Sequence, residues 1–337
     1  MNCVCGRRHL MLGGLAAGLF GATAVTAAGK PRRIDVHHHV VPPMWVEAVK
    51  KAKLDNPPMT GWTPEHSLED MDKAGTTTAM LSPMPPHVGF LPALEAASIA
   101  RASNEWTRKL ANDHPDRFGV FAMLPMPNIE DSLKEIAYAF DTLKVDGVGL
   151  MTNYNNKWLG HDAFAPVFEE LNRRKAVVYT HPISPACCVN VLPGVPDFIV
   201  EWGADTTRTI VSLIFTGASM RYPDINFIFS HGGGVLTAEA ERLRMQILLA
   251  PPYKGKFTRE MVDHELKRFY YDTAQVSNEV TIQALVQLVG LSQIVFGTDY
   301  PYRTGAEHVA GLAQRFSADD LAVIDSGNVL RILPKWG

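Results

Sequence analysis

The stretch "RIDVHHH", residues 33–39, has the composition of a short buried strand and ends in three consecutive histidines. In a strand, side chains two residues apart point to the same face, so His37 and His39 share one face while His38 points into the opposite layer. The pair allows two interpretations, a metal site or buried histidines that hydrogen-bond within the core. The position of this strand in the whole chain helps to distinguish them.

From residue 30 onward the sequence repeats one pattern, a short apolar run followed by a polar loop and a longer segment with helical spacing. Helix stop signals such as Gly75 and Gly290 close several of these segments. The apolar runs predict eight strands, at residues 33–39, 77–83, 118–125, 148–153, 176–182, 226–232, 269–274 and 294–299.

Eight strands that alternate with helices predict an α/β fold, a closed (β/α)8 TIM barrel. We expect it to form a single domain over residues 32–335. An open doubly wound sheet is the alternative, although no Gly-x-Gly-x-x-Gly follows the first strand. Three segments, 41–62, 82–90 and 182–198, are predicted as long connections that form lids or pocket walls at one rim.

The first 28 residues differ from the rest of the chain. Arg7 and Arg8 precede an apolar stretch rich in Leu, Gly and Ala, which is similar to a twin-arginine export signal. An ordinary secretion signal or an uncleaved anchor is the alternative. The stretch is short and Gly-rich, so we expect a periplasmic or otherwise exported protein with no stable membrane span after processing.

The formal net charge of the chain is −3, and it has no long basic run. This composition argues against nucleic-acid binding and favours a small-molecule partner.

Three further polar residues stand at the ends of predicted strands: His181 ends the fifth, His231 the sixth and Asp299 the eighth. In a barrel the carboxyl ends of all strands meet at one mouth, where enzymes of this fold have their active sites. We therefore predict one divalent metal ion bound by four side chains, with zinc first and manganese or iron as alternatives. The predicted ligands are His37, His39, His181 and Asp299. His231 is predicted as an acid or base beside the ion, and Asp299 is alternatively a pure proton carrier.

Four motifs, Asp-Val-His-x-His, Thr-His-Pro, Ser-His-Gly-Gly-Gly and Phe-Gly-Thr-Asp-Tyr-Pro, occur in this order. Together they resemble the amidohydrolase superfamily over about residues 32–335, and in particular its decarboxylase branch. The resemblance implies that the barrel is of the metal-dependent hydrolase type. That branch includes aminocarboxymuconate-semialdehyde decarboxylase and the salicylate-type decarboxylases, and several segments are similar to 6-methylsalicylate decarboxylase-like members.

The resemblance implies that His37, His39 and His181 bind the metal. It also implies that Asp299 is the aspartate near the metal that exchanges a proton, and that His231 is the catalytic histidine. Binuclear amidohydrolases carry a carboxylated lysine at the end of strand four, whereas this strand ends in Met-Thr-Asn at residues 151–153. A single metal ion is therefore expected.

An aromatic acid needs a cationic group for its carboxylate, and arginine provides paired hydrogen bonds. The candidates are Arg208, Arg242 and Arg303, each of which is alternatively a surface ion-pair residue. Arg242 matches a substrate arginine that some relatives donate across a dimer interface, so a homodimer is predicted. Other candidate residues are Trp62, which we predict to bind substrate, His66 and His87 on the early rim loops, and Asp272 and Thr273 as hydrogen-bond partners of the ligands.

The predicted function is metal-dependent, non-oxidative decarboxylation of a small aromatic, salicylate-type or muconate-type carboxylic acid. In this hypothesis a protonated Asp299 with a raised pKa delivers a proton to the ring carbon, and CO2 leaves. One alternative is a single-metal hydrolase of a lactone or amide. Another is a non-catalytic periplasmic metal-binding protein.

Overall fold

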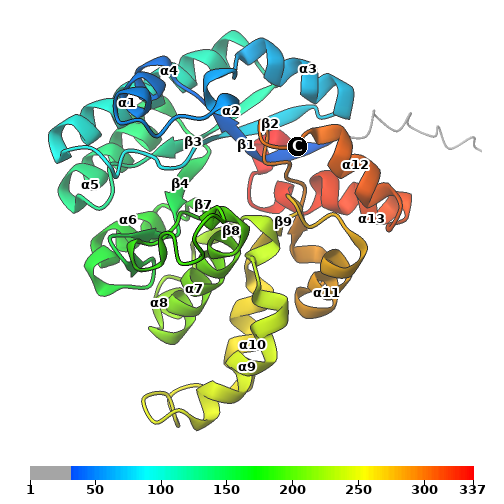
Figure 1. Cartoon of the computed structure of the whole chain (residues 1–337). Helices are drawn as coiled ribbons and strands as arrows, with labels where there is room; N and C mark the ends of the chain where they lie inside the picture. Colours follow the sequence, from blue (N-terminus) through cyan, green and yellow to red (C-terminus); the bar gives the residue numbers. More distant parts are fainter. Residues whose placement is uncertain (1–31) are drawn as a thin grey trace, which may run out of the picture. The chain divides into compact units, whose positions relative to one another are not determined.

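Eight parallel strands form one sheet in which nearly every strand pairs with the next in the chain, and helices surround them (Figure 1). The computed structural model describes residues 32–337, so the predicted export signal at residues 1–28 lies outside the described residues. The predicted TIM barrel is confirmed. Its strands are β1 (Ile34–Val40), β2 (Thr78–Pro83), β3 (Phe118–Met123), β4 (Gly147–Met151), β7 (Val177–His181), β8 (Asn226–Phe229), β9 (Tyr270–Asp272) and β10 (Ile294–Val295).

The barrel closes where β1 meets the segment that follows β10. The backbone N–H of Val36 donates to the carbonyl of Phe296 at 3.0 Å, and that of His39 donates to Tyr300 at 2.9 Å. His38 and Tyr300 also form an isolated parallel bridge. Backbone hydrogen bonds thereby join the first strand to the segment that directly follows the last.

The helices follow the strands in the predicted alternation. Their bounds are α1 (Pro43–Lys51), α2 (Pro57–Thr60), α3 (Pro64–Ala74), α4 (Ala93–Asp113), α5 (Ile129–Tyr138), α6 (Ala165–Arg173), α7 (Glu201–Phe215), α8 (Ala218–Arg221), α9 (Leu236–Leu249), α10 (Arg259–Arg268), α11 (Glu279–Val289), α12 (Gly305–Ala313) and α13 (Ala318–Ala322). A two-stranded hairpin, β5 (Asn153–Tyr154) and β6 (Lys157–Trp158), follows β4. Among residues 32–337, no helix combines the length and apolar character needed to cross a bilayer.

Helix boundaries follow the sequence signals. Gly75, the predicted stop of α3, adopts φ +66° and donates its N–H back to the helix, a conformation that favours glycine. In Figure 1, α9 and α10, coloured yellow, project away from the strands.

The segment 41–62, predicted as a long connection, contains the helices α1 and α2, so that prediction is wrong in part. Each helix begins with a proline in its first turn, where the missing N–H costs no hydrogen bond. On α1, Trp45, Ala48 and Val49 have i, i+3, i+4 spacing and are buried. This spacing was the local signal for the helix.

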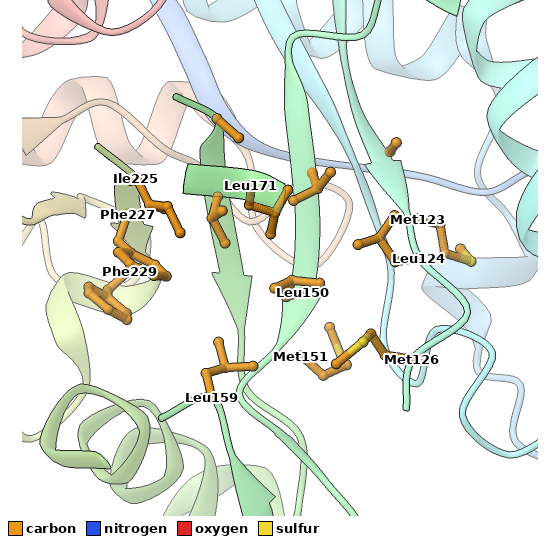
Figure 2. Close-up of a cluster of buried hydrophobic side chains, with 14 of the residues drawn as sticks. Met123, Leu124, Met126, Leu150, Met151, Leu159, Leu171, Ile225, Phe227 and Phe229 are labelled. Atoms are coloured by element: carbon orange, nitrogen blue, oxygen red, sulfur yellow. The ribbon is translucent and has the colours of Figure 1, made fainter. Parts of the chain in front are cut away.

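Two apolar clusters hold the barrel together. The larger lies between strands and helices, and Figure 2 shows part of it, with Leu150 of β4, Phe227 and Phe229 of β8 and Leu171 of α6. The smaller joins residues of several strands to the C-terminal segment, where Trp336 is buried. Tyr179 of β7 belongs to the smaller cluster, and its ring centroid lies 5.2 Å from that of His37. The apolar interior therefore borders the histidines of β1 directly.

Candidate metal centre

Four buried side chains from three parts of the barrel meet at its mouth. The ligand atoms of His37, His39, His181 and Asp299 all lie within 4.8 Å of one another. The distances from Asp299 Oδ1 to Nε2 are 3.1 Å for His37, 3.2 Å for His39 and 3.9 Å for His181. The four residues that the sequence predicts as ligands are thus brought together.

The backbone aims each of these side chains at the centre. His37 and His39 lie near the carboxyl end of β1, and His181 is the last residue of β7. Asp299 adopts the left-handed region with φ +67°, and its N–H donates to the carbonyl of His37 at 2.9 Å. Strained non-glycine backbone of this kind is maintained only where the surrounding structure fixes it. At Asp299 the closing contact between β1 and the segment after β10 provides that support.

Unpartnered atoms show that the cluster fits a metal ion. His181 Nε2 and Asp299 Oδ1 are buried and have no hydrogen-bond partner. The opposite ring nitrogens are held by the protein, since His37 Nδ1 lies 2.8 Å from Asp272 and His181 Nδ1 lies 2.9 Å from the Pro182 carbonyl. Protons on these Nδ1 atoms leave the Nε2 lone pairs free to coordinate. The donor set of three imidazoles and one carboxylate suits one divalent ion.

The charges around His37 also indicate a site for a cation. Burial lowers the pKa of His37, but the carboxylates of Asp272 and Asp299 outweigh burial and raise it to about 10. In the absence of an ion, the imidazolium compensates the two buried carboxylates, as a bound divalent ion would. Burial lowers the pKa of His39 and of His181, so both are neutral imidazoles, the form that coordinates metals.

The expected raised pKa of Asp299 is not found. Burial raises the pKa of this carboxyl, but the charge of His37 and the hydrogen bond with His231 hold it well below its usual range. Asp299 is therefore a carboxylate. This form suits a metal ligand and leaves no standing proton for the substrate.

The second oxygen of Asp299 faces two other side chains. His231 Nε2 lies 3.3 Å from Oδ2, and Gln275 Nε2 donates to the same oxygen at 2.6 Å. His231 reaches this position because its backbone, with φ +54°, turns immediately after β8. His231 is thus beside the ligand cluster, as the sequence predicts, whereas Gln275 was missed because no local pattern marks it.

His38 lies on the other side of β1, as the strand geometry predicts. Its Nδ1 is 3.0 Å from Asp35 and its Nε2 is 3.0 Å from Ser67 of α3. Its ring stacks on Tyr300 at 4.6 Å between centroids. His38 is therefore a core residue with satisfied hydrogen bonds. The interpretation as a metal site applies to His37 and His39, and the interpretation as a buried, hydrogen-bonded histidine applies to His38.

Asp35 is a supporting residue that sequence reasoning missed. Its Oδ1 accepts from the backbone N–H of His37 at 2.9 Å and from that of Thr298 at 3.1 Å. Its Oδ2 accepts from the Thr298 hydroxyl at 2.6 Å. The Asp35 carboxylate therefore fixes the backbone at His37 and at Thr298, the residue before Asp299.

The predicted substrate residues have other partners. Arg208 lies 3.3 Å from Glu201. Arg242, whose side chain is 74% exposed, lies 3.9 Å from Glu239. Trp62 is buried and packs edge to face with Trp106 at 6.2 Å. None of these three contacts involves a member of the metal cluster.

The remaining candidates divide into surface and buried residues. Arg303 forms a surface ion pair with Glu307, and His66 is exposed. His87 is buried. Thr273 bonds the backbone of Gly297, so of the predicted outer partners only Asp272 contacts a ligand directly.

A cavity of about 280 Å³ opens at the same mouth. Its walls come from the loops after β2, β3, β4 and β7 and include Pro86, Phe90, Met151 and Ile183. Met151 pairs with His181 across the sheet, and Ile183 follows His181 by two residues. The cavity therefore borders the ligand cluster through the end of β7, and its mainly apolar walls suit an aromatic ring.

The chain belongs to the amidohydrolase family, which residues 34–334 match. The decarboxylase yanB of Aspergillus niger is 40% identical over 289 residues, which cover 80% of this chain and 77% of that protein. The 6-methylsalicylic acid decarboxylase of Penicillium expansum is 34% identical over 319 residues, covering 90% of this chain and 96% of that protein. The predicted resemblance to the decarboxylase branch is confirmed.

A solved structure agrees with the fold. The dihydroxybenzoic acid decarboxylase from Polaromonas, determined with bound manganese and the inhibitor 2-nitroresorcinol, aligns with a TM-score of 0.80 at 20% identity. The alignment covers 90% of this chain and 96% of that one.

Proposed function

We propose that this protein is a metal-dependent, non-oxidative decarboxylase of a small aromatic acid of the salicylate type, and hence a carboxy-lyase. The observation that carries the proposal is the convergence of three imidazoles and the Asp299 carboxylate at the barrel mouth, with His231 on the second carboxylate oxygen. The relatives described above are decarboxylases, which favours this reaction over hydrolysis of a lactone or amide and over a non-catalytic binding protein.

The reaction replaces the carboxylate on a ring carbon with a proton. The carbon–carbon bond breaks, CO2 leaves, and the electron pair that remains on the ring carbon takes up one proton. When bound by His37, His39, His181 and Asp299, a divalent cation supplies a Lewis acid that stabilises negative charge on substrate oxygens.

The chain itself must supply the proton. Because Asp299 is held as a carboxylate, we assign the proton donor to the pair formed by His231 and Asp299, whose Nε2 and Oδ2 atoms are 3.3 Å apart. His231 brings the proton and Asp299 Oδ2 orients it toward the ring carbon. The amide of Gln275 holds Oδ2 in place and thereby fixes the geometry of the pair.

For the metal we propose zinc, with manganese as the alternative. A set of three histidines and one aspartate suits zinc, while the manganese in the Polaromonas decarboxylase supports the alternative. Elemental analysis of the purified protein, followed by reconstitution with each ion, distinguishes the two.

The deciding experiment incubates the metal-loaded protein with 6-methylsalicylate, other salicylates, muconate-type acids and lactones, while CO2 and ring-opened products are measured. CO2 from a salicylate supports the proposal. Turnover of a lactone with no CO2 from any acid would reject it.

Two further parts of the proposal concern assembly and location. We propose a homodimer in which the exposed Arg242 reaches the partner's substrate, which light scattering and an Arg242→Ala variant test through mass and KM. In that arrangement Arg208 and Trp62 are the substrate-binding candidates of the same chain.

We also propose that residues 1–28 direct export to the periplasm. Cell fractionation and N-terminal sequencing of the mature protein test this.

A further inference from the structure

His87, in the loop between β2 and α4, is a buried polar residue that the proposed reaction does not use. It is 1% exposed, and its Nδ1 has no hydrogen-bond partner. A buried polar atom without a partner is costly, so such an atom commonly marks a place where a ligand or water completes the bonding.

The backbone at His87 is held in an unusual conformation. Its φ is +57°, in the left-handed region that residues other than glycine seldom adopt. The His87 N–H donates to the Met84 carbonyl at 3.0 Å, and the indole of the buried Trp45 donates to the His87 carbonyl at 2.6 Å. Val88, the next residue, is fully buried. The protein thus fixes this imidazole in place at the cost of backbone strain, as is common at binding sites.

The position of His87 connects it to both halves of the site. Its neighbours Pro86, Gly89 and Phe90 line the cavity of about 280 Å³. The same segment reaches the metal cluster through Ser82, whose Oγ lies 3.4 Å from Nδ1 of His39. Burial lowers the pKa of His87 to about 3, against the opposing effect of the Pro83 carbonyl. The imidazole is therefore neutral, and it stands in a segment that contacts both a predicted metal ligand and the cavity.

We propose that His87 is a substrate-binding residue, whose Nδ1 forms a hydrogen bond with an oxygen of the aromatic acid held between the metal ligands and the cavity. This inference rests on the proposed function. A neutral imidazole can donate or accept through Nδ1 according to its tautomer, so it can bond a phenolic hydroxyl or a carboxylate oxygen. It would orient the ring without adding a buried charge.

Two substitutions separate this role from a structural one. Glycine and asparagine both tolerate the left-handed backbone, so His87→Gly and His87→Asn keep the loop conformation accessible. The carboxamide of asparagine both donates and accepts, whereas glycine leaves no polar group. The control is His264→Asn on α10, where the histidine side chain is 74% exposed.

The measurements are the equilibrium affinity of the metal-loaded protein for 2-nitroresorcinol, KM and kcat for 6-methylsalicylate, metal content and melting temperature. We expect His87→Gly to weaken 2-nitroresorcinol binding and raise KM at least about tenfold, while His87→Asn stays within about threefold of the parent. Metal content is expected to be unchanged in both variants.

Equal affinity in the parent and both variants would overturn the proposal, because the partner of Nδ1 would then be water alone. Equal losses in both variants together with loss of metal would also overturn it, in favour of a structural role. If the parent releases no CO2 from any acid, the proposed function fails, and the binding data alone decide the role of His87. Absence of 2-nitroresorcinol binding by the parent rejects the His87 proposal.

Discussion

Asp272 links His37 to His231: its Oδ2 lies 2.8 Å from His37 Nδ1, and its Oδ1 accepts the backbone N–H of His231 at 2.8 Å. One buried carboxylate at the end of β9 thus orients a predicted metal ligand and the predicted proton donor together. Outer partners of this kind fix the tautomer of a ligating histidine and raise its basicity.

Replacement of Asp272 by asparagine keeps the shape but removes the charge that orients His37. We expect Asp272→Asn to lower metal affinity about 10–100-fold, measured by competition with a chelator. Asp162→Asn, at a carboxylate whose side chain is 86% exposed, is the matched control. Equal affinities in the Asp272 variant and the parent would contradict this role.

Removal of the metal should destabilise the barrel, because an ion bound only by the folded state stabilises that state. With a chelator, the melting temperature is expected to fall by roughly 5 °C or more and to recover on addition of zinc or manganese. His181→Ala should melt at the same temperature with and without added ion. A melting temperature of the parent that does not respond to either ion would be evidence against the site.

Substitutions at His231 and at Asp299 should distinguish metal binding from proton transfer. His231→Asn is expected to retain the ion and to lose about 10²–10⁴-fold in kcat, since it removes the proton donor alone. Asp299→Asn should lose both metal and activity. CO2 release together with elemental analysis of each variant checks this. Full activity in His231→Asn would exclude it as the donor.

Asp35 should contribute mainly to stability. Asp35→Ala leaves the buried N–H groups of His37 and Thr298 without their acceptor, so we expect the free energy of unfolding in urea to fall by about 2 kcal/mol or more. A double-mutant cycle with Thr298→Val should show coupling, because the hydroxyl of Thr298 donates to the same carboxylate. Additive effects would mean that the two residues act independently.

Gly297 has no room for a side chain. A Cβ at this position would lie 2.8 Å from the Cβ of Asp272 and 2.9 Å from that of His37. Gly297→Ala should therefore cost about 1–3 kcal/mol and displace His37, lowering metal affinity as well. Chemical denaturation and chelator competition test the two effects separately.

Much of the site follows from the sequence because its ligands lie at strand ends. The periodicity of apolar runs located the strands, and in a closed barrel that places His37, His181 and Asp299 at one mouth. The alternation along β1 also separated His38 from its neighbours. Local spacing therefore predicts which residues meet, once the topology is known.

The supporting residues follow from no local pattern. Asp35 bonds Thr298 across 263 positions of the chain, and Gln275 reaches Asp299 from a loop. The low pKa of Asp299 depends on the charge of His37 and on hydrogen bonds, which the sequence does not reveal. The partners of Arg208 and Trp62 likewise depend on how helices pack, so periodicity did not predict these contacts.

Because hydrogen bonds join β1 to the residues after β10, the ligand cluster can form only late in the synthesis of the chain. Two ligands are made among the first residues of the domain, and the fourth, Asp299, is made near its end. A nascent chain shorter than 299 residues cannot assemble the complete coordination sphere. Acquisition of the ion thus reports that the ring of strands has been completed, and a truncated or unfinished chain would not retain it.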